Sequence, residues 1–274
     1  MHNIEKQNAL VCPICKAEMA LGETSLACGG ERRHNFDKAK SGYVNLNTHK
    51  STSGDDKEMA KARQSFLRGG YYKPFAEAIA KEVGSGEFLV DAGCGEGYYT
   101  EICAENFSAA LGVDLSKHAL DLAAKSAKQK GLADKIFYAT ASVYELPVKE
   151  ASVDAVVNIF APCVENEYAR VLKNGGRLIV AAAGKNHLSG LKSVLYETVT
   201  ENEERHDYPK DMRLANTVKV QYTAKINGED IWQLFMMTPY YYKTSKEAAE
   251  KLKSLQSLET LLDFEIRTYI KEEK

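Results

Sequence analysis

Short apolar runs alternate along this chain with segments in which apolar residues recur every three or four positions. The runs have the length of strands and end at turn residues, whereas the amphipathic segments have helical spacing. Strands that alternate with helices predict an α/β fold with a mostly parallel sheet. We expect strands at residues 89–91, 109–114, 135–140, 153–160, 177–183, 218–226 and 261–270.

Polar residues with capping ability mark the starts of several predicted helices. Asp55 or Asp56 precedes an amphipathic segment that ends at two glycines, and Ser116 and Ser245 precede two others. Asp and Ser side chains accept hydrogen bonds from the free N–H groups of a first helical turn. We expect helices at residues 57–67, 72–83, 98–106, 116–130, 165–172 and 230–237, with one more after residue 191 and another after residue 245.

The first predicted strand runs into a turn with glycine at three alternate positions, Gly93, Gly95 and Gly97. Glycine adopts positive φ without strain and has no Cβ to separate the backbone from a ligand. The strand, turn and helix therefore predict a cradle for a flat nucleoside. The dinucleotide-binding fingerprint needs its third glycine three residues after the second. The residues at that spacing here are Tyr98 or Thr100, so the turn fits the dinucleotide fingerprint poorly.

Acids near the turn narrow the choice of nucleoside. Asp91 and Glu96 suit a ligand with a cationic group better than a pyrophosphate. Asp114 ends the next strand nineteen residues after Gly95, close to the spacing of about 20 at which an acid binds ribose hydroxyls. The alternating Asp-x-Gly-x-Gly-x-Gly turn resembles the first motif of class I S-adenosylmethionine methyltransferases. The resemblance implies S-adenosylmethionine as cofactor and a Rossmann-like domain with a seven-stranded, mostly parallel sheet.

Three further candidates follow the third and fourth predicted strands. Ser142 stands in a loop that resembles the adenine-contacting loop of these methyltransferases, at a position where an acid is usual. Asn158 and Phe160 end the fourth strand, where many base methyltransferases receive the target base. Phe160 could stack on a flipped base, although packing in the core explains a phenylalanine equally well.

Three ring-bearing residues are candidates because of their positions. Tyr72 stands just ahead of the helix that leads into the main domain, and His187 follows the fifth strand on the ligand side. Each could contact the cofactor, and each could equally be a core residue. Tyr240, within a run of three tyrosines, is a candidate for the substrate entrance.

Clustered cysteine near the N-terminus points to a metal. The spacing C-x2-C-x12-C-x5-H is formed by Cys12, Cys15, Cys28 and His34. This pattern is typical of a structural zinc site, in which four protein ligands fill the tetrahedron and leave no position for a reacting water. Asp37 or His49 could replace His34 as the fourth ligand.

Charge is nearly balanced over the chain, with a formal net charge of −2, so a nucleic acid would need a local basic patch. Residues 31–73 contain ten Lys and Arg against five Asp and Glu, an excess of +5. The aromatic residues interleaved with them are Phe36, Tyr43, Phe66, Tyr71 and Tyr72. Basic charge beside exposed rings is typical of proteins that bind looped or single-stranded RNA. A solvated helix face accounts for about half of these residues.

We divide the chain into three parts. Residues 1–48 form a zinc-binding RNA-recognition module, residues 49–71 a linker and connecting helix, and residues 72–274 the S-adenosylmethionine-dependent methyltransferase domain. No apolar run approaches the roughly 18 residues that span a bilayer, and the N-terminus lacks a signal-peptide pattern. We therefore expect a soluble, cytoplasmic protein with no membrane partner.

Several segments together are more specific than the glycine turn. They are the cysteine knuckle, residues 36–46, Gly54-Asp55 with Glu58-Met59 and Ala62-Arg63, residues 95–100, Ala161-Pro162-Cys163, and Met237-Thr238-Pro239. In these segments, and over nearly its whole length, the chain resembles the bacterial 23S rRNA guanine-N1-methyltransferases, the family that includes the tylosin-resistance methyltransferase.

The resemblance implies transfer of a methyl group to N1 of one of two neighbouring guanosines in a 23S rRNA hairpin. It also implies a homodimer whose two zinc modules flank the RNA. The residues it assigns are Cys12, Cys15, Cys28 and His34 to one structural zinc ion, and Tyr72, Gly95, Glu96 and His187 to the cofactor. It identifies no general base for the N1 proton, and it does not decide whether the chain confers antibiotic resistance.

Two other functions stay open at this point. One is a class I methyltransferase that acts on a small molecule, although the zinc knuckle and the basic segment would then have no evident use. The other is a noncatalytic RNA-binding protein that keeps the methyltransferase fold as a scaffold, which the intact glycines and acids of the turn disfavour.

Overall fold

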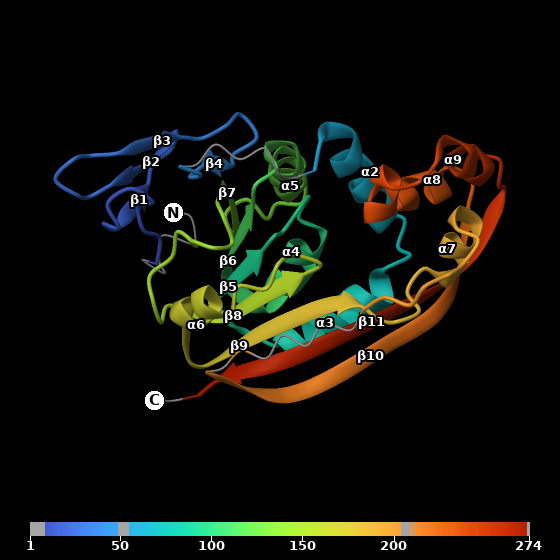
Figure 1. Ribbon diagram of the computed structural model, residues 1–274. Helices are drawn as coiled ribbons and strands as arrows, with labels where there is room; N and C mark the ends of the chain where they lie inside the picture. The colour runs from blue at the N-terminus through green and yellow to red at the C-terminus, as the bar shows by residue number, and fades with distance from the viewer. Residues whose placement is uncertain (1–8, 49–54, 204–208, 210, 273–274) are drawn as a thin grey trace.

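The computed structural model describes residues 9–48, 55–203, 209 and 211–272, and one large sheet organises most of them (Figure 1). Its strands are β4 (Val44–Asn45), β5 (Gly86–Ala92), β6 (Phe107–Asp114), β7 (Ile136–Thr140), β8 (Val153–Ile159), β9 (Leu172–Ala183), β10 (Met212–Asn227) and β11 (Ser257–Lys271). They lie in the order β10-β11-β9-β8-β5-β6-β7-β4. The strands from β9 to β4 run parallel, and only β11 and β10 are antiparallel to their neighbours. The predicted mostly parallel α/β fold is confirmed.

Among the described residues, every helix expected from the sequence is present, although the one expected after residue 191 begins at Ser189. The helices are α2 (Lys57–Arg68), α3 (Lys73–Val83), α4 (Tyr98–Cys103), α5 (Lys117–Gln129), α6 (Glu165–Val171), α7 (Ser189–Leu195), α8 (Glu229–Met236) and α9 (Lys246–Lys253), with short 3-10 turns at Ala104–Asn106 and Pro239–Tyr242. The caps are as predicted. Asp56 accepts hydrogen bonds from the first turn of α2, Ser116 from α5 and Ser245 from α9.

Alternating side chains of the strands build two apolar cores, one on each face of the sheet. Leu89 belongs to the core that lies under α2, α3, α4 and α5 and extends to α7, α8 and α9. Its neighbour Val90 belongs to the opposite core, which includes residues of α6 and of the N-terminal module. The zinc module thus covers a sheet face that helices cover in most parallel sheets.

The N-terminal module is a small antiparallel sheet of β1 (Met19–Leu21), β2 (Ser25–Cys28) and β3 (Asn35–Asp37). Its last strand, β4, leaves it and pairs in parallel with β7, which makes the large sheet eight-stranded. Seven of the eight strands therefore come from the predicted methyltransferase domain. The Leu46 N–H donates to the Thr140 carbonyl at 2.9 Å, and Leu10 forms a bridge with Val148. Backbone hydrogen bonds fasten the module to the sheet.

One strand begins earlier than the sequence indicates. We expected a helix to residue 172, a turn at Asn174-Gly175-Gly176, and a strand from residue 177. In the structure β9 begins at Leu172, which pairs with Val153, and the register shifts before Arg177 pairs with Ala155. Gly175, with φ +75°, lies inside that irregularity. The two glycines therefore form a bulge within the strand instead of ending the structure.

Two expectations fall on residues that the structure does not describe. Residues 49–54, the first part of the predicted linker and connecting helix, lie outside the described ranges, and His49 is among them. Among the described residues, no helix is long and apolar enough to cross a membrane.

Candidate functional site

The glycine turn lies at the carboxyl end of β5, where the sequence placed it. Gly93, Gly95 and Gly97 have φ of +88°, +54° and +84°, so the predicted positive φ is confirmed at all three. A Cβ on Gly93 would lie 2.6 Å from the Cβ of Ala161, in the loop after β8. Only glycine fits this approach of the turn to the neighbouring strand end.

Asp114 ties the turn to the end of β6. One of its oxygens accepts from the Gly95 N–H at 3.0 Å, and the other accepts from the Ser116 N–H at 2.7 Å. Each carboxylate oxygen can accept a further hydrogen bond. The acid that the sequence assigned to ribose therefore holds the turn in place and keeps acceptor capacity for a ligand.

Asp91 and Glu96 are both buried beside the turn, and burial raises the pKa of each to about 7. Asp91 accepts a hydrogen bond from the Thr100 hydroxyl. Glu96 accepts from the Tyr98 N–H at 3.3 Å through one oxygen, while the other is buried without a hydrogen-bond partner, 3.9 Å from Arg68 Nη2. A buried acceptor of this kind is costly unless a donor reaches it.

Tyr72 and His187, which lie 115 positions apart, form a hydrogen bond of 3.1 Å between Tyr72 Oη and His187 Nε2. His187 Nδ1 accepts from the Asp263 N–H at 3.2 Å, so the ring proton is on Nε2 and is donated to Tyr72. Burial, with the nearby charge of Lys192, lowers the pKa of His187 to about 3. The imidazole is therefore neutral at physiological pH, and the Tyr72 hydroxyl keeps its own proton to donate.

The remaining candidates differ in exposure. Phe160 has φ +55° and is 45% exposed beside Phe75 and His187. A bulky residue with positive φ is strained, and such strain clusters at functional sites. Asn158 is buried, and its amide N–H groups donate to the Pro162 carbonyl and to Tyr168 Oη. Phe160 is thus better placed than Asn158 to meet a substrate.

Ser142 and Tyr240 have structural contacts of their own. Ser142 Oγ accepts from the Tyr144 N–H at 3.2 Å within the loop after β7. Tyr240 is half-buried, and its ring lies 6.0 Å from that of Tyr196 and from the ammonium of Lys192. Neither contact excludes a ligand, so both assignments stay predictions.

The four predicted metal ligands come together in the N-terminal module. Their ligand atoms all lie within 4.8 Å of one another. Cys15 Sγ lies 3.8 Å from Cys28 Sγ, and His34 Nδ1 lies 3.5 Å from Cys12 Sγ and 3.4 Å from Cys28 Sγ. With Zn–S bonds of about 2.3 Å, the edges of a tetrahedral site measure roughly 3.5–3.8 Å. The cluster therefore fits one zinc ion with four protein ligands.

His34 is the fourth member of this cluster, and the alternative Asp37 is an exposed residue of β3. The His34 N–H also donates to Cys28 Sγ at 3.2 Å. This hydrogen bond, with others at the same sulfur, lowers the pKa of the Cys28 thiol to about 6. A thiolate at neutral pH is the form that binds zinc.

Two family models match the two parts of the chain. Residues 10–50 match the model described as "RlmA, N-terminal", a zinc ribbon, and residues 90–180 match the model described as "Methyltransferase domain". A Streptomyces fradiae protein named 23S rRNA (guanine(748)-N(1))-methyltransferase is 33% identical over 196 residues, which are 68% of this chain and 67% of that protein. The chain belongs to the 23S rRNA (guanine-N1)-methyltransferase family.

Other comparisons agree with this family. The Bacillus subtilis protein YxjB, assigned as a 23S rRNA (guanine-N1)-methyltransferase, is 29% identical over 273 residues, 93% of this chain and 94% of that protein. The crystal structure of Bacillus subtilis YcgJ aligns with a TM-score of 0.51 and 16% identity, and it covers 73% of this chain and 98% of that one. The second likeness shows the fold alone. The protein is an S-adenosylmethionine-dependent methyltransferase with an N-terminal zinc ribbon.

The crevice of this methyltransferase suits the cofactor chemically. S-adenosylmethionine carries an ammonium, a carboxylate, a sulfonium and a ribose. The unpartnered oxygen of Glu96 offers an acceptor to a cation, and Asp114 offers acceptors to hydroxyls. The positive φ of Gly95 and the absence of a Cβ leave its backbone open to a flat ligand. We keep Tyr72, Asp91, Gly93, Gly95, Glu96, Gly97, Asp114, Ser142 and His187 as the predicted cofactor residues.

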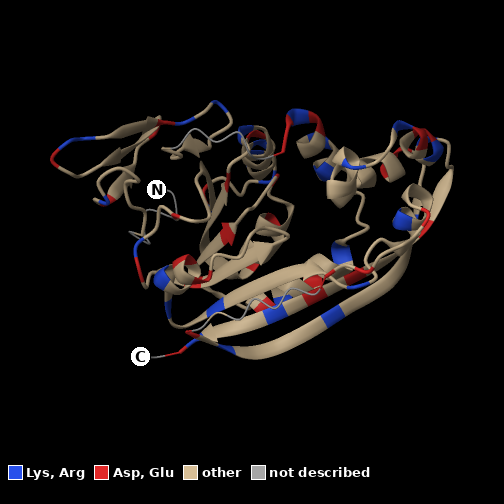
Figure 2. Ribbon diagram, in the orientation of Figure 1, with Lys and Arg blue, Asp and Glu red and all other residues tan. Residues whose placement is uncertain are grey.

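The basic segment differs from our expectation. Phe66 and Tyr72 are buried in the core and cannot stack on RNA. Arg63 pairs with Asp55, and Arg68 pairs with the buried Glu101 at 3.4 Å, so both face the methyltransferase domain. The exposed basic residues among the described part of the segment are Arg32, Arg33, Lys40, Lys57, Lys61, Arg68 and Lys73. Figure 2 shows Lys and Arg in blue both beside β3 and on α2.

Nothing in the sequence indicated a cofactor role for Arg63 or Asp55, although Arg63 lies over the glycine turn and pairs with Asp55. Their only signal was membership of a shared segment, because a contact between α2 and the turn depends on how α2 docks. Thr100, whose hydroxyl donates to Asp91, likewise had no signal beyond its place in the segment 95–100.

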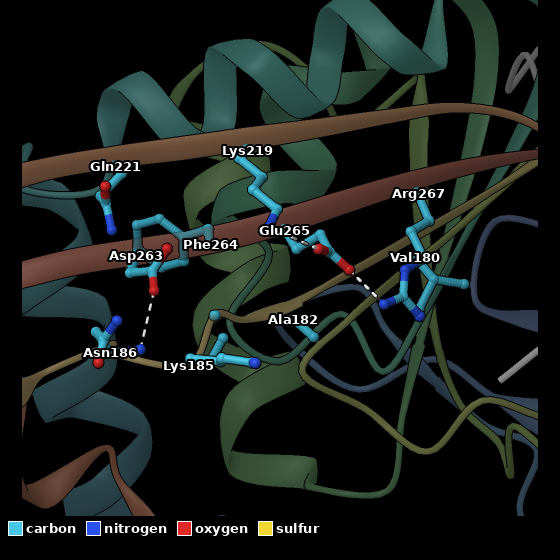
Figure 3. Close-up of a pocket in the computed structure, with 12 residues that line it drawn as sticks. Val180, Ala182, Lys185, Asn186, Lys219, Gln221, Asp263, Phe264, Glu265 and Arg267 are labelled. Atoms are coloured by element: carbon cyan, nitrogen blue, oxygen red, sulfur yellow. Dashed lines mark hydrogen bonds and ion pairs between the residues drawn. The ribbon is translucent and has the colours of Figure 1, made fainter. Parts of the chain in front are cut away.

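A pocket of about 260 Å³ lies beside the end of β9 and not at the glycine turn (Figure 3). Polar residues of three adjacent segments line it, namely Lys185, Asn186, Lys219, Gln221, Asp263, Glu265 and Arg267. Glu265 pairs with Arg267 and lies 3.9 Å from Lys219, and Asp263 accepts from the Asn186 N–H at 2.9 Å. With its charges paired across the strands, we interpret this surface as a solvated sheet face.

Proposed function

We propose that this protein transfers a methyl group from S-adenosylmethionine to N1 of a specific guanosine in a 23S rRNA hairpin. The observation that carries the proposal is the union, in one chain, of a zinc ribbon of the RlmA type with a methyltransferase crevice. A relative with 33% identity is named for this reaction. A small-molecule methyltransferase would have no evident use for the zinc module.

The crevice contributes mainly by positioning. When bound, S-adenosylmethionine supplies an electrophilic methyl group. The chain's task is to hold donor and acceptor at near-attack distance, which alone can account for a large part of a rate enhancement. We propose that Phe160, which is exposed and has positive φ at the end of β8, stacks on the guanine.

The hydrogen bond between Tyr72 and His187 orients a donor in the crevice without supplying a base. Burial raises the pKa of the Tyr72 hydroxyl and lowers that of His187, so neither group changes charge near neutral pH. Since His187 Nε2 donates to Tyr72, the Tyr72 proton points to another acceptor. We propose that this acceptor belongs to the bound cofactor.

Primer extension tests the reaction directly. The protein is incubated with labelled S-adenosylmethionine and an unmodified 23S hairpin RNA, and the product is reverse-transcribed. A methyl group at N1 blocks the Watson–Crick edge, so we expect label in the RNA and a stop at one guanosine. Label in a small metabolite would instead favour a small-molecule methyltransferase, and tight RNA binding without transfer would favour a scaffold.

The division into parts and the assembly belong to the same proposal. Residues 1–48 would recognise RNA, residues 49–71 would connect, and residues 72–274 would carry the reaction. We also propose a homodimer whose two zinc modules flank the hairpin. Light scattering of the zinc-loaded protein checks the dimer, and a monomer at micromolar concentration would contradict it.

A further inference from the structure

Arg63 lies directly over the glycine turn, although its helix belongs to the connecting segment. A Cβ built on Gly95 would lie 3.7 Å from Arg63 Nη1. On its other side, Arg63 Nη2 donates to the Met237 carbonyl at 3.3 Å, just after α8. The guanidinium therefore bridges α2, the turn and the C-terminal helices.

A chain of polar contacts connects the start of α2 to the turn. The Asp55 carboxylate pairs with Arg63, and the Asp55 carbonyl accepts from Ser116 Oγ at 2.6 Å. The Ser116 N–H donates to Asp114, which in turn accepts from Gly95. Arg63, Asp55, Ser116 and Asp114 thus form a chain of polar contacts that ends at the Gly95 N–H.

The charge of Arg63 acts on several crevice residues at once. It is among the charges that lower the pKa of Glu96, Tyr72 and Tyr99, while burial raises all three. These residues come from the turn, from the start of α3 and from α4. The charge of Arg63 therefore acts on both halves of the predicted site, the glycine turn through Glu96 and the Tyr72–His187 pair through Tyr72.

The other cation near the turn is differently engaged. Arg68 donates to Ser126 Oγ at 2.7 Å and pairs with two buried acids, Glu101 at 3.4 Å and Glu96 at 3.9 Å. The Arg63 side chain is 29% exposed, so solvent and a ligand can reach it. Its contacts with Asp55 and Met237 use two of the three guanidinium nitrogens. A guanidinium has five N–H donors and suits carboxylates in particular.

We propose that Arg63 binds the α-carboxylate of the methionine moiety of S-adenosylmethionine. The amino acid end of the cofactor is a zwitterion, and the crevice offers charges of both signs at the turn. The buried Glu96 oxygen, which accepts no hydrogen bond and lies 3.9 Å from Arg68 Nη2, would face the ammonium, and the Arg63 guanidinium would face the carboxylate. The inference rests on the methyltransferase activity but not on guanosine N1 as the acceptor.

Calorimetry with two ligands isolates the carboxylate. S-adenosylmethionine and its decarboxylated analogue differ only in that group, and neither titration needs RNA. We expect the wild-type protein to bind S-adenosylmethionine about ten- to a hundred-fold more tightly than the analogue, as for a charge-assisted hydrogen bond. Arg63→Met should bind the two ligands equally, with the analogue's affinity unchanged. Arg63→Lys, which keeps the charge without the planar fork, should retain part of the preference.

Lys61→Met is the matched control, because it removes one charge from an exposed position of the same helix. It should keep the full preference. A preference retained in Arg63→Met would overturn the proposal. If Arg63→Met bound neither S-adenosylmethionine nor the analogue, the proposal would also be overturned, because Arg63 would then maintain the structure of the site instead of binding the carboxylate. If the wild-type protein bound neither ligand, the assignment of the crevice to the cofactor would fail as well.

Discussion

The zinc module and the large sheet reach a folded state by different means. Strands β1 to β3 have three or four residues each, too few to bury a core of their own, and four metal ligands hold them together. The strands of the large sheet reach sixteen residues and bury apolar side chains on both faces. The fold of the first region should depend on a metal ion, and that of the second on burial.

The same contrast separates two functions. The predicted cofactor residues of the glycine turn lie at the carboxyl end of β5, beside the end of β6. The zinc module packs on one face of the sheet through Leu26 and Val44, whereas Cys94 of the glycine turn belongs to the core on the other face. We therefore expect the module to affect RNA recognition far more than cofactor binding.

Loss of zinc should have the largest effect. We expect Cys28→Ser to lose the metal and unfold the module, because a structural zinc ion contributes on the order of 10 kcal/mol to a small module. Native mass spectrometry should show one zinc per wild-type chain and none in the variant. Affinity for S-adenosylhomocysteine should change less than about threefold. A module that stays folded without metal would refute the comparison.

Gly95→Arg should have the opposite outcome. The side chain would enter the crevice beside Arg63, so we expect at least about a hundredfold loss of cofactor affinity by calorimetry, with zinc content unchanged. Gly131→Arg is the control, since Gly131 also has positive φ, at +71°, and an added Cβ there meets no atom within 4 Å. The control carries a similar backbone strain of about 1 kcal/mol. Equal loss in both variants would indicate strain and not occlusion.

Cofactor binding should depend on pH through Glu96. Its pKa of about 7 means that the free protein holds this proton at pH 6 and has largely released it at pH 8. A cationic ammonium favours the carboxylate, so affinity for S-adenosylmethionine should rise about tenfold over that range. Calorimetry in buffers of different ionisation enthalpy would detect the released proton. Glu96→Gln should remove the dependence, and a pH-independent wild type would contradict the assignment.

The free energy of unfolding should change with pH in the opposite direction to cofactor affinity. The pKa of Glu96 and of Asp91 is higher in the folded protein than the ordinary carboxyl value, so the folded state binds more protons than the unfolded state below pH 7. The free energy of unfolding of the sheet should therefore fall as pH rises from about 4 to 7. Denaturant titrations of the ligand-free protein check this direction, and a rise over that range would contradict it.

The smallest effect concerns α2, which joins the two regions. Asp56→Ala removes a cap that accepts from two N–H groups, so we expect a loss of about 1 kcal/mol in the free energy of unfolding. Ser245→Ala removes the cap of α9 at similar cost. Only Asp56→Ala should also weaken cofactor binding, because α2 lies over the turn. Equal cofactor affinities in Asp56→Ala and Ser245→Ala would show that α2 has no influence on the cofactor site.

Local signals in the sequence predicted the turn and the zinc ligands well. The positive φ of Gly93, Gly95 and Gly97 follows from the absence of a side chain, and the quartet ending at His34 follows from ligand spacing. Both depend on residues close together in the chain. The caps at Asp56 and Ser116 are local in the same sense.

Features that depend on docking could not be predicted in this way. Phe66 reads as part of a basic, aromatic segment, yet the packing of α2 and α3 buries it. The pairing of β4 with β7 joins residues almost a hundred positions apart. Arg63 meets Gly95 only because Ser116 and Asp114 hold the start of α2. No pattern within α2 shows which domain its charges will face.

The most direct measurement combines cofactor binding and RNA methylation in one variant. Wild-type protein and Cys28→Ser are each titrated with S-adenosylhomocysteine and then assayed on the 23S hairpin by primer extension. The account predicts nearly equal cofactor affinities and a reverse-transcription stop with the wild-type protein alone. A stop of equal strength at the same guanosine with the zinc-free variant would contradict the claim that the sheet binds the methyl donor and the zinc module selects the RNA.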